Sequence, residues 1–393
     1  MSTLLFIFER DMPTVSIMRE MFTHLRSHDD MSSTFMYMSD VKPKDIDAHD
    51  VIIFIRPNNT YAWKLADNAK KAGHTVVTLC DDDLLNLPKT SPTIPWRKRG
   101  LLKALKHSDV ILSTSRYIAE RYRDLTAGKR MALMDTVVRP EEFDGIETVF
   151  NNGDDDGKVK IVYAAAPSHA VLFEKFIGPI LPALKSEFGD RISFTFVSVH
   201  PEVTDFRCEY VPGMPLLEYR EYMKKSRFDI GVAPLYDDDF SKCKYYNKYI
   251  EYTLQGTVGI YSETEPYTYV VKNGYNGFLA KSSPEAWLEA MRQAIRDKEK
   301  RDLCLKRAVD HLRESHSEDA VIEKIRQGLP EISAAGTGYG SCKGFGLRKV
   351  LYMLSRPFDW IYLTGFYIKN TGIKAVIKRI KKHFIEAEAY RRR

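Results

Sequence analysis

The feature that most constrains the fold is a series of short, wholly apolar segments that alternate with helix-like segments. In the first 150 residues, the apolar segments lie at 4–8, 51–55, 75–79 and 110–113. A segment that is apolar at every position, instead of at every second one, is typical of a parallel strand buried on both faces. Strands of this kind with helices between them predict a doubly wound α/β sheet.

The series breaks once and then starts again. Residues 151–157 read Asn-Asn-Gly-Asp-Asp-Asp-Gly, a cluster of turn formers and acids that is typical of a linker. Apolar segments then recur at 159–164, 192–199, 229–233 and 257–261. We therefore expect two Rossmann-like lobes, at 1–150 and 158–330, in a chain that is long enough for two cores. Ligands of such sheets bind beside the carboxyl ends of the strands, and we expect the active site there.

The C-terminal part differs from the rest in composition. Residues 331–346 are rich in Gly and Ser and predict a flexible connector, and residues 347–393 predict a basic helical tail. Residues 341–393 hold 13 Lys or Arg and 3 Asp or Glu. Residues 1–340 hold 46 Lys or Arg and 50 Asp or Glu. The basic excess of the chain therefore belongs to its tail.

The tail also has the pattern of an amphipathic helix. Its apolar residues at helical spacing are Ile373, Val376, Ile377, Ile380 and Phe384, and the basic residues that flank them are Lys374, Lys378, Arg379, Lys381 and Lys382. A basic amphipathic helix is typical of a segment that lies on an anionic membrane surface. The alternative is that the apolar stripe packs on the protein body. No nucleic-acid-binding module accompanies the charge, so nucleic acid is not an expected partner.

Three features bear on the compartment. No uncharged apolar run approaches the ~20 residues that span a bilayer, and the N-terminus lacks the basic region and the cleavage site of a signal peptide. The five cysteines include no CxxC pair, which argues against a disulfide framework or a zinc knuckle and favours a reducing compartment. We expect a cytoplasmic protein that is peripheral at the inner face of the cell membrane.

A pattern between residues 228 and 288 resembles a known family. It runs, in order, through Pro234-Leu235, acids and Phe240, Lys244-x-x-x-Lys248-x-x-Glu251-Tyr252, Pro266-Tyr267 and Asn273-Gly274-x-x-Gly277. This pattern is similar to the donor-binding half of GT-B glycosyltransferases, in particular the family 4 or group 1 enzymes of bacterial surface-polysaccharide synthesis. A weaker resemblance to the same family covers nearly all of residues 1–330.

The resemblance implies a retaining, metal-independent transfer of a sugar from a UDP- or GDP-linked donor to an acceptor hydroxyl, in the synthesis of a cell-surface glycan or polysaccharide. The sugar nucleotide would be a substrate, with no permanently bound cofactor and no metal ion. A tail on the membrane would suit a lipid-linked glycan acceptor. The alternatives are a sugar-nucleotide epimerase of the same fold and a non-catalytic scaffold in a membrane-bound synthesis complex.

The resemblance also implies roles for residues of the second lobe. Glu251 would bond the ribose hydroxyls, and Lys244 and Lys248 would meet the diphosphate. Residues at i and i+4 share one face of a helix, and cations there stabilise the charge that develops on a leaving diphosphate. A solvated lysine pair with a Glu partner is the alternative. Two positions depart from the family pattern, because Cys243 stands where many relatives have Glu and Tyr245 stands where closer relatives often have Ser.

Loops at the ends of strands supply the other donor-side candidates. Ser168 and His169 follow the first strand of the second lobe, where relatives approach the phosphates with backbone amides. Ser168 as the cap of the next helix is the alternative, and His169 is also a catalytic candidate. Tyr210 is placed like the loop that contacts the nucleobase. The segment Glu265-Pro266-Tyr267, at the start of a helix, would offer backbone amides to the donor sugar or phosphate.

The acceptor-side candidates are acids of the first lobe. Asp82 and Asp83 follow the strand at 75–79, where a carboxylate can contact the acceptor or assist in removing its proton. The alternative is that they are acids favoured at the first turn of a helix. Arg56, after the strand at 51–55, is a further candidate. Neither this acid cluster nor the one at 237–239 is assigned a metal ion.

Overall fold

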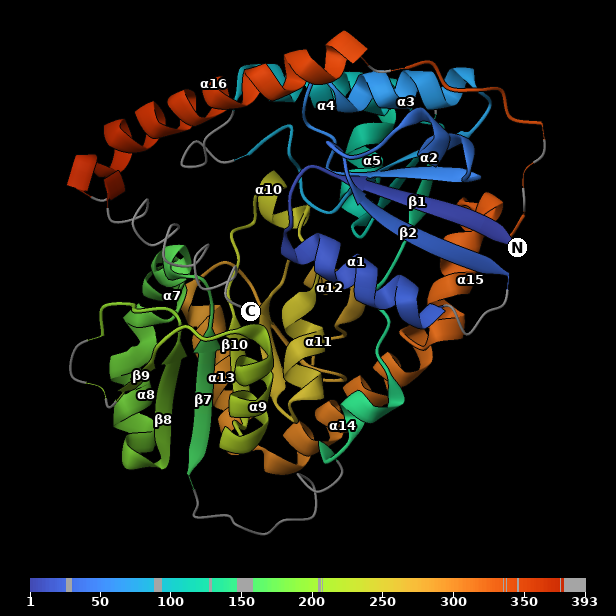
Figure 1. The fold of residues 1–393 in the computed structure, drawn as a ribbon. Helices are drawn as coiled ribbons and strands as arrows, with labels where there is room; N and C mark the ends of the chain where they lie inside the picture. The colour runs from blue at the N-terminus through green and yellow to red at the C-terminus, as the bar shows by residue number, and fades with distance from the viewer. Residues whose placement is uncertain are drawn as a thin grey trace. The chain divides into compact units, whose positions relative to one another are not determined.

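The computed structural model describes residues 1–25, 30–87, 94–126, 129–146, 158–203, 206, 208–334, 336, 338–344, 346–374 and 376–377. The chain divides into two compact units. Unit 1 comprises Met1–Ser113, Ala119–Ala132 and Arg326–Arg393, and unit 2 comprises Thr114–Ile118 and Leu133–Ile325. Each unit contains a six-stranded sheet with helices packed on it (Figure 1). The expected fold of two doubly wound α/β lobes is therefore confirmed.

The sheet of unit 1 has the strand order β2-β1-β3-β4-β5-β6, and the pairs from β2 to β5 are parallel. The strands are β1 Ser2–Phe8, β2 Met31–Tyr37, β3 Val51–Ile55, β4 Thr75–Cys80, β5 Val110–Ser113 and β6 Arg130–Leu133. The helices are α1 Pro13–His24, α2 Pro43–Asp47, α3 Ala62–Lys71, α4 Pro95–His107, α5 Arg116–Arg123 and α16 Gly346–Thr371. Strands β1 and β3 are neighbours although β2 lies between them in sequence, so the switch point of this sheet lies between them.

The segment before α16 is packed against unit 1. Cys342 is buried among apolar residues of β1, β3 and α3. The Tyr339 ring stacks on the His74 ring with centroids 4.3 Å apart, and the Tyr339 hydroxyl donates to Asp50 Oδ1 at 3.0 Å. The segment expected as a flexible connector at 331–346 thus makes contacts with unit 1 over its described residues. The side chains that stand between the glycines make buried contacts that composition alone does not reveal.

The sheet of unit 2 has the strand order β12-β11-β10-β7-β8-β9. Its strands are β7 Val159–Ala164, β8 Ile192–Val197, β9 Cys208–Val211, β10 Ile230–Ala233, β11 Val258–Ser262 and β12 Phe278–Ala280. The helices that follow β7 are α7 Ala170–Phe176, α8 Leu181–Phe188, α9 Leu216–Ser226, α10 Asp239–Lys242, α11 Asn247–Leu254, α12 Tyr267–Val270, α13 Pro284–Arg296, α14 Lys298–Ser315 and α15 Glu318–Gly328. The single helix expected near 171–187 is thus two helices, because Gly178 and Pro179 interrupt it and Pro179 has no N–H to donate.

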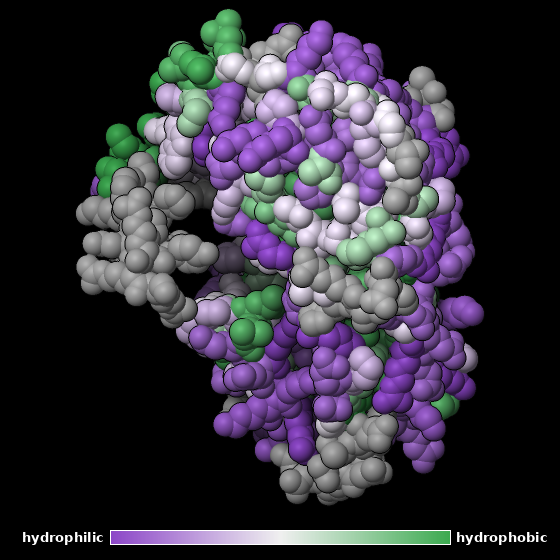
Figure 2. Space-filling view, turned by 45° about the vertical axis from the view of Figure 1, so that its right-hand side comes forward, coloured by the Kyte–Doolittle hydropathy of each residue, from purple (hydrophilic) through white to green (hydrophobic). Residues whose placement is uncertain are grey.

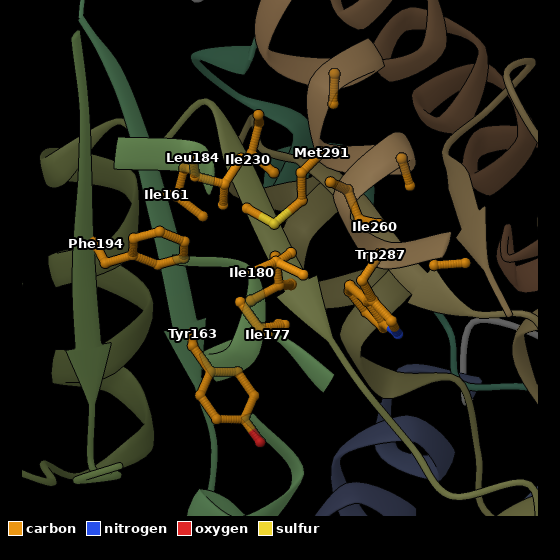
Figure 3. Close-up of a cluster of buried hydrophobic side chains, with 14 of the residues drawn as sticks. Ile161, Tyr163, Ile177, Ile180, Leu184, Phe194, Ile230, Ile260, Trp287 and Met291 are labelled. Atoms are coloured by element: carbon orange, nitrogen blue, oxygen red, sulfur yellow. The ribbon is translucent and has the colours of Figure 1, made fainter. Parts of the chain in front are cut away.

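Both faces of the unit 2 sheet are buried, which explains why its strands are apolar throughout. Ile161 and Tyr163 of β7 belong to one hydrophobic core, and Val162 and Ala164 belong to the other. Figure 3 shows the first core, in which the fully buried Trp287 of α13 packs over the strands. Successive residues of a strand point to opposite faces, so each strand contributes to two cores.

The unit boundaries differ from the lobe boundaries expected from sequence. Val138, Phe143 and Ile146 are buried in a core of unit 2, ahead of the expected start at 158. The chain returns to unit 1 at Arg326. Turn-forming residues identify a loop, but they do not indicate in which core the flanking segments are buried. The linker-like residues 151–157 lie outside the described residues.

Helix α16 is the last long element that the structure describes. No described helix is long and apolar enough to cross a membrane. Of the amphipathic pattern expected beyond α16, the structure describes Ile373, Val376 and Ile377 with Lys374, and Val376 is buried. The later residues of that pattern, Lys378, Arg379, Ile380, Lys381, Lys382 and Phe384, lie outside the described part of the chain.

Candidate active site

A pocket of about 570 Å³ lies at the carboxyl ends of the central strands of unit 2. Ala165 after β7, Ser198 after β8 and Pro234 after β10 all line it. From β7 the chain moves to β8 and β9 on one side and returns to β10 on the other, so β7 and β10 flank the switch point of this sheet. Loops that leave these strands in opposite directions open a crevice in which ligands of such sheets bind.

Two lysines line this pocket from the segment that leads into α11. Lys248 lies in the first turn of α11, whereas Lys244 lies before the helix begins. The expectation that the two share one helix face is therefore wrong, because the turn between α10 and α11 interrupts the helix. The pocket nevertheless brings both side chains together. Among the described residues, Lys244 has no carboxylate partner, and its Nζ lies 5.4 Å from the centroid of the Phe240 ring.

Lys248 differs from Lys244 because it has an ion-pair partner. Its Nζ lies 2.5 Å from Glu251 Oε2, and the Tyr219 hydroxyl donates to the same oxygen at 3.3 Å. Burial alone would lower the pKa of Lys248, but the Glu251 carboxylate offsets this effect and the pKa is raised. Lys248 is thus kept charged. Glu251 itself is not part of the pocket wall, although Lys248 and Tyr219, which contact it, are.

His169 lines the pocket together with the two lysines. Burial, and then the positive charges of Lys244 and Lys248, lower the pKa of the imidazole from 6.5 to about 4. The ring is therefore neutral at pH 7. The Tyr163 hydroxyl donates to the His169 carbonyl oxygen at 2.8 Å, which holds the loop after β7 in place. Cations that disfavour protonation of a neighbouring imidazole favour an anionic ligand in the same space.

Only one of the remaining donor-side candidates lines the pocket. This residue is Tyr267, which is 4% exposed and whose pKa is raised by burial. Pro266 is buried directly before it. Ser168 is exposed, and no side-chain hydrogen bond caps α7. Tyr210 stacks on Phe196 with centroids 5.1 Å apart. None of Pro266, Ser168 and Tyr210 lines the pocket.

Ser198 and Tyr219 are among the pocket residues that the sequence did not indicate. Ser198 has a φ of 62°, a left-handed conformation that residues with a side chain seldom adopt, and its N–H donates to the Val211 carbonyl oxygen at 2.9 Å. Strain of this kind concentrates at ligand-binding sites. Tyr219 comes from α9 and meets Glu251 only in the folded chain. Neither a strained serine nor a contact between distant segments leaves a local signal in the sequence.

In unit 1, the acids after β4 are tied to Arg56. Arg56 has a φ of 48°, forms a two-nitrogen ion pair with Asp81 and lies 2.8 Å from Asp82 Oδ2. Asp83 is fully buried and accepts a hydrogen bond from the Tyr122 hydroxyl at 2.9 Å. The Asp83 carboxylate therefore has partners inside unit 1, whereas the Asp82 side chain is 35% exposed. A role for Asp82 or Asp83 toward an acceptor stays a prediction.

One group of described residues, which lies outside the pocket, brings together three types of metal-ligating side chain. Donor atoms of Asp47, His74 and Cys342, all in unit 1, lie within 4.8 Å of one another. Asp47 Oδ1 already accepts the Cys342 N–H at 2.9 Å. Among the acids at 237–239, Asp238 caps α10 by accepting the Ser241 N–H at 2.7 Å. These acids thus have structural partners.

The two departures from the family pattern are both accommodated inside unit 2. Cys243 is fully buried. Tyr245 lines the pocket, accepts the Thr136 N–H at 3.1 Å and donates its hydroxyl to Asp135 Oδ1 at 3.2 Å. The tyrosine at this position therefore connects the pocket wall with the segment that leads from β6 into unit 2.

Comparisons with known proteins bear on the fold. No protein-family model matches the chain, and no curated protein matches it in sequence. HepE from Anabaena, solved with UDP and glucose, has a TM-score of 0.56 at 11% identity, over 84% of this chain and 100% of that one. Sucrose-phosphate synthase from Thermosynechococcus elongatus has a TM-score of 0.59 at 11% identity, and the match covers 83% of this chain and 98% of that one. A glycosyltransferase from Rickettsia africae has a TM-score of 0.57 at 12% identity, over 84% and 98%. The chain thus shares their two-lobed GT-B architecture.

Proposed function

We propose that this chain is a glycosyltransferase that moves a sugar from a nucleoside diphosphate donor to an acceptor hydroxyl. The observation that carries the proposal is the pocket at the switch point of unit 2, where Lys244, Lys248 and the neutral His169 meet. Among the described residues Lys244 has no carboxylate partner, and a pocket with such a cation suits a ligand with two phosphates. Structures of similar fold that were solved with UDP or UDP-glucose support a donor of this kind.

The charges of the pocket fit the chemistry of sugar transfer. In the proposed reaction, the bond from the anomeric carbon to the diphosphate breaks while a bond to the acceptor oxygen forms. The proton of the acceptor hydroxyl passes to a base, for which Asp82 is the candidate, and negative charge develops on the leaving diphosphate. Lys244 has no carboxylate partner among the described residues, so its charge is available to that group. Cations held in place before the reaction stabilise the transition state more than the ground state.

Glu251 has a separate role in the proposed donor site, which is to bind the ribose. Its Oε2 holds Lys248 and Tyr219, both of which line the pocket. A modest rotation of the Lys248 side chain toward the diphosphate would free this oxygen for the ribose hydroxyls of the donor. In this view, the Lys248–Glu251 pair is the resting arrangement of the donor site, and the donor replaces part of it.

The finer features of the proposed reaction rest on the sequence pattern. The donor is UDP- or GDP-linked, the anomeric configuration is retained, and lysine side chains supply the charge for which other transferases use a metal ion. The acceptor belongs to cell-surface glycan or polysaccharide synthesis. The residues proposed to contact it are Arg56 and Asp82, at the carboxyl ends of β3 and β4.

The test is a thermal-shift panel of UDP, GDP, CDP and ADP, each with and without magnesium. It compares the wild type with Lys244→Ala and with Lys225→Ala. The control residue Lys225 is an exposed lysine near the end of α9, whereas the pocket meets the start of that helix. We expect one diphosphate to raise the melting temperature of the wild type and of Lys225→Ala without magnesium, and to have little effect on Lys244→Ala.

Two other outcomes would change the proposal. A shift that requires magnesium would replace the metal-independent mechanism by a metal-assisted one. If no nucleotide shifts a folded wild-type chain, the donor site is not functional and a non-catalytic scaffold becomes the better account.

A further inference from the structure

Helix α16 presents an apolar face to solvent. The residues of this face are Leu347, Leu351, Leu354, Phe358 and Ile361, and they recur at alternating spacings of four and three. Each is between 57% and 74% exposed. Figure 2 shows hydrophobic residues in green at the upper left, where this helix lies. An exposed apolar stripe of this length marks an interaction surface more often than ordinary protein surface.

Buried polar contacts fix the opposite face of α16 to unit 1. Tyr352 is 3% exposed and donates its hydroxyl to Glu9 Oε1 at 3.1 Å. Asp359 is 7% exposed, accepts the Trp96 indole N–H at 2.6 Å and pairs with Arg97 at 2.5 Å. Turning the apolar face inward would separate Asp359 from these partners and leave the largely buried Arg97 guanidinium and the Trp96 N–H with fewer hydrogen bonds, which is costly. The apolar face therefore stays outward.

Exposed cations outnumber acids on α4 and on the described residues of α16. Helix α4, which contacts α16 through Trp96 and Arg97, contains no acidic residue. The exposed cations of α4 and α16 are Lys98, Arg99, Lys103, Lys106, Arg356 and Lys369. The one acid of α16 is Asp359, and its charge is taken up by Arg97. The described part of α16 and its neighbour α4 thus combine an exposed apolar stripe with an excess of exposed cations over acids.

We propose that this surface of α16 and α4 lies on an anionic lipid bilayer. Acyl chains would cover the apolar face, and anionic headgroups would pair with the cations. A second copy of the chain fits less well, because a two-fold contact would bring the same cations of both copies together. The inference goes beyond the proposed function, because it concerns where the chain is held and does not depend on its reaction. Within the tail at 347–393 that the sequence indicated, it places the membrane contact on α16, and it adds α4 to the surface.

The first experiment measures sedimentation of the full chain with vesicles, in the absence of nucleotide. The vesicles contain phosphatidylcholine alone or phosphatidylcholine with phosphatidylglycerol. The apolar-face variant carries Leu351→Ser, Leu354→Ser and Phe358→Ser. The matched control carries Leu125→Ser, Leu217→Ser and Leu303→Ser, at three exposed leucines outside α16. We expect the apolar-face variant to lose about tenfold or more in vesicle affinity, and the control to bind like the wild type.

A second variant tests the charge. Lys98→Ala, Arg99→Ala and Lys106→Ala together should weaken binding to the anionic vesicles by about fivefold per charge, with no loss on phosphatidylcholine alone. All variants should keep the wild-type melting temperature, since the substituted side chains are exposed. Wild-type affinity in the apolar-face variant would overturn the proposal. So would a wild-type dimer in light scattering that this variant converts to a monomer, because the face would then join two copies.

Discussion

His169 is the residue that reports most directly on the charge of the pocket. Its pKa of about 4 reflects burial and the two lysines, which disfavour the imidazolium. A bound diphosphate brings negative charge to those lysines and removes part of this penalty. We therefore expect nucleotide binding to raise the pKa of His169 by about one unit or more. The measurement is the pH dependence of its ring NMR signals, with and without UDP or GDP.

The same coupling predicts a pH dependence of nucleotide binding. His169 binds a proton more readily in the complex than in the free protein. Complex formation therefore takes up protons at pH values between the pKa of His169 in the free protein and its higher pKa in the complex, and the affinity for the nucleotide rises as the pH falls through that range. His169→Gln should remove this contribution. The difference between wild type and variant is the quantity to follow, because the titration of the nucleotide itself cancels. An unchanged pKa of His169 on binding would place the diphosphate elsewhere.

Glu251 allows a separate test of ribose recognition. If its carboxylate accepts the ribose hydroxyls, the wild type should bind a ribonucleotide on the order of tenfold more tightly than the 2′,3′-dideoxy analogue. Glu251→Ala should bind the two equally. Titration calorimetry with both nucleotides measures this preference. A wild type that does not distinguish them would leave Glu251 only its structural contact with Lys248 and Tyr219.

Among single residues, the sequence predicts the members of the site that lie close together in one short segment of the chain. Lys244 and Lys248 lie close together in the chain and also line one pocket. Tyr219 and Ser198 come from other segments, and only the packing of the sheet brings them to the same space. The sequence separation of Lys244, Lys248 and Glu251 does not specify their side-chain positions. It therefore does not predict that Lys248 pairs with Glu251 whereas Lys244, among the described residues, has no carboxylate partner.

At the scale of elements, the sequence identifies the eight interior strands of the two sheets and misses all four edge strands. The missed strands are β2, β6, β9 and β12. An interior strand is buried on both faces and reads as an apolar run. By contrast, β2 reads MSSTFMY and β9 reads CEYV, and both have exposed or half-exposed positions. Edge strands are often short and polar, which limits pairing with other chains but also hides them from pattern analysis.

The docking of the segment before α16 gives a prediction at the same scale. Tyr339 contributes a ring that stacks on His74 and a hydroxyl bonded to Asp50. Tyr339→Phe should lower the free energy of unfolding by about 1 kcal/mol through loss of the hydrogen bond. Tyr339→Ala should lower it by about 2–3 kcal/mol, because the stacking is lost as well. Urea unfolding followed by circular dichroism measures both values, and equal stability of all three proteins would mean that this segment is not docked in solution.

At the scale of the whole molecule, buried histidine predicts how stability depends on pH. His316 is 1% exposed, and burial together with nearby positive charge lowers its pKa to about 4. The unfolded chain, with a histidine pKa near 6.5, binds more protons between these values, so stability falls as the pH drops from about 6.5 to 4. The loss amounts to about 3 kcal/mol for this residue.

Urea unfolding of the wild type and of His316→Gln at several pH values tests this expectation. The variant should be less stable than the wild type at pH 7, because Tyr246 and Ser315 lose a ring that they contact. Its stability should, however, decline less steeply toward pH 5. The exposed His200→Gln variant is the control and should follow the wild type. Parallel pH profiles for all three proteins would contradict a depressed pKa at His316.

In the proposed function, the pocket of unit 2 holds a diphosphate through Lys244. Titration calorimetry with the nucleoside monophosphate and diphosphate of the preferred base tests it most directly, on the wild type, Lys244→Ala and Lys225→Ala. We expect the wild type and Lys225→Ala to bind the diphosphate at least about tenfold more tightly than the monophosphate. We also expect Lys244→Ala to lose most of this preference while its affinity for the monophosphate changes little. If Lys244→Ala keeps the preference, or weakens both ligands equally, Lys244 does not contact the second phosphate and the claim is contradicted.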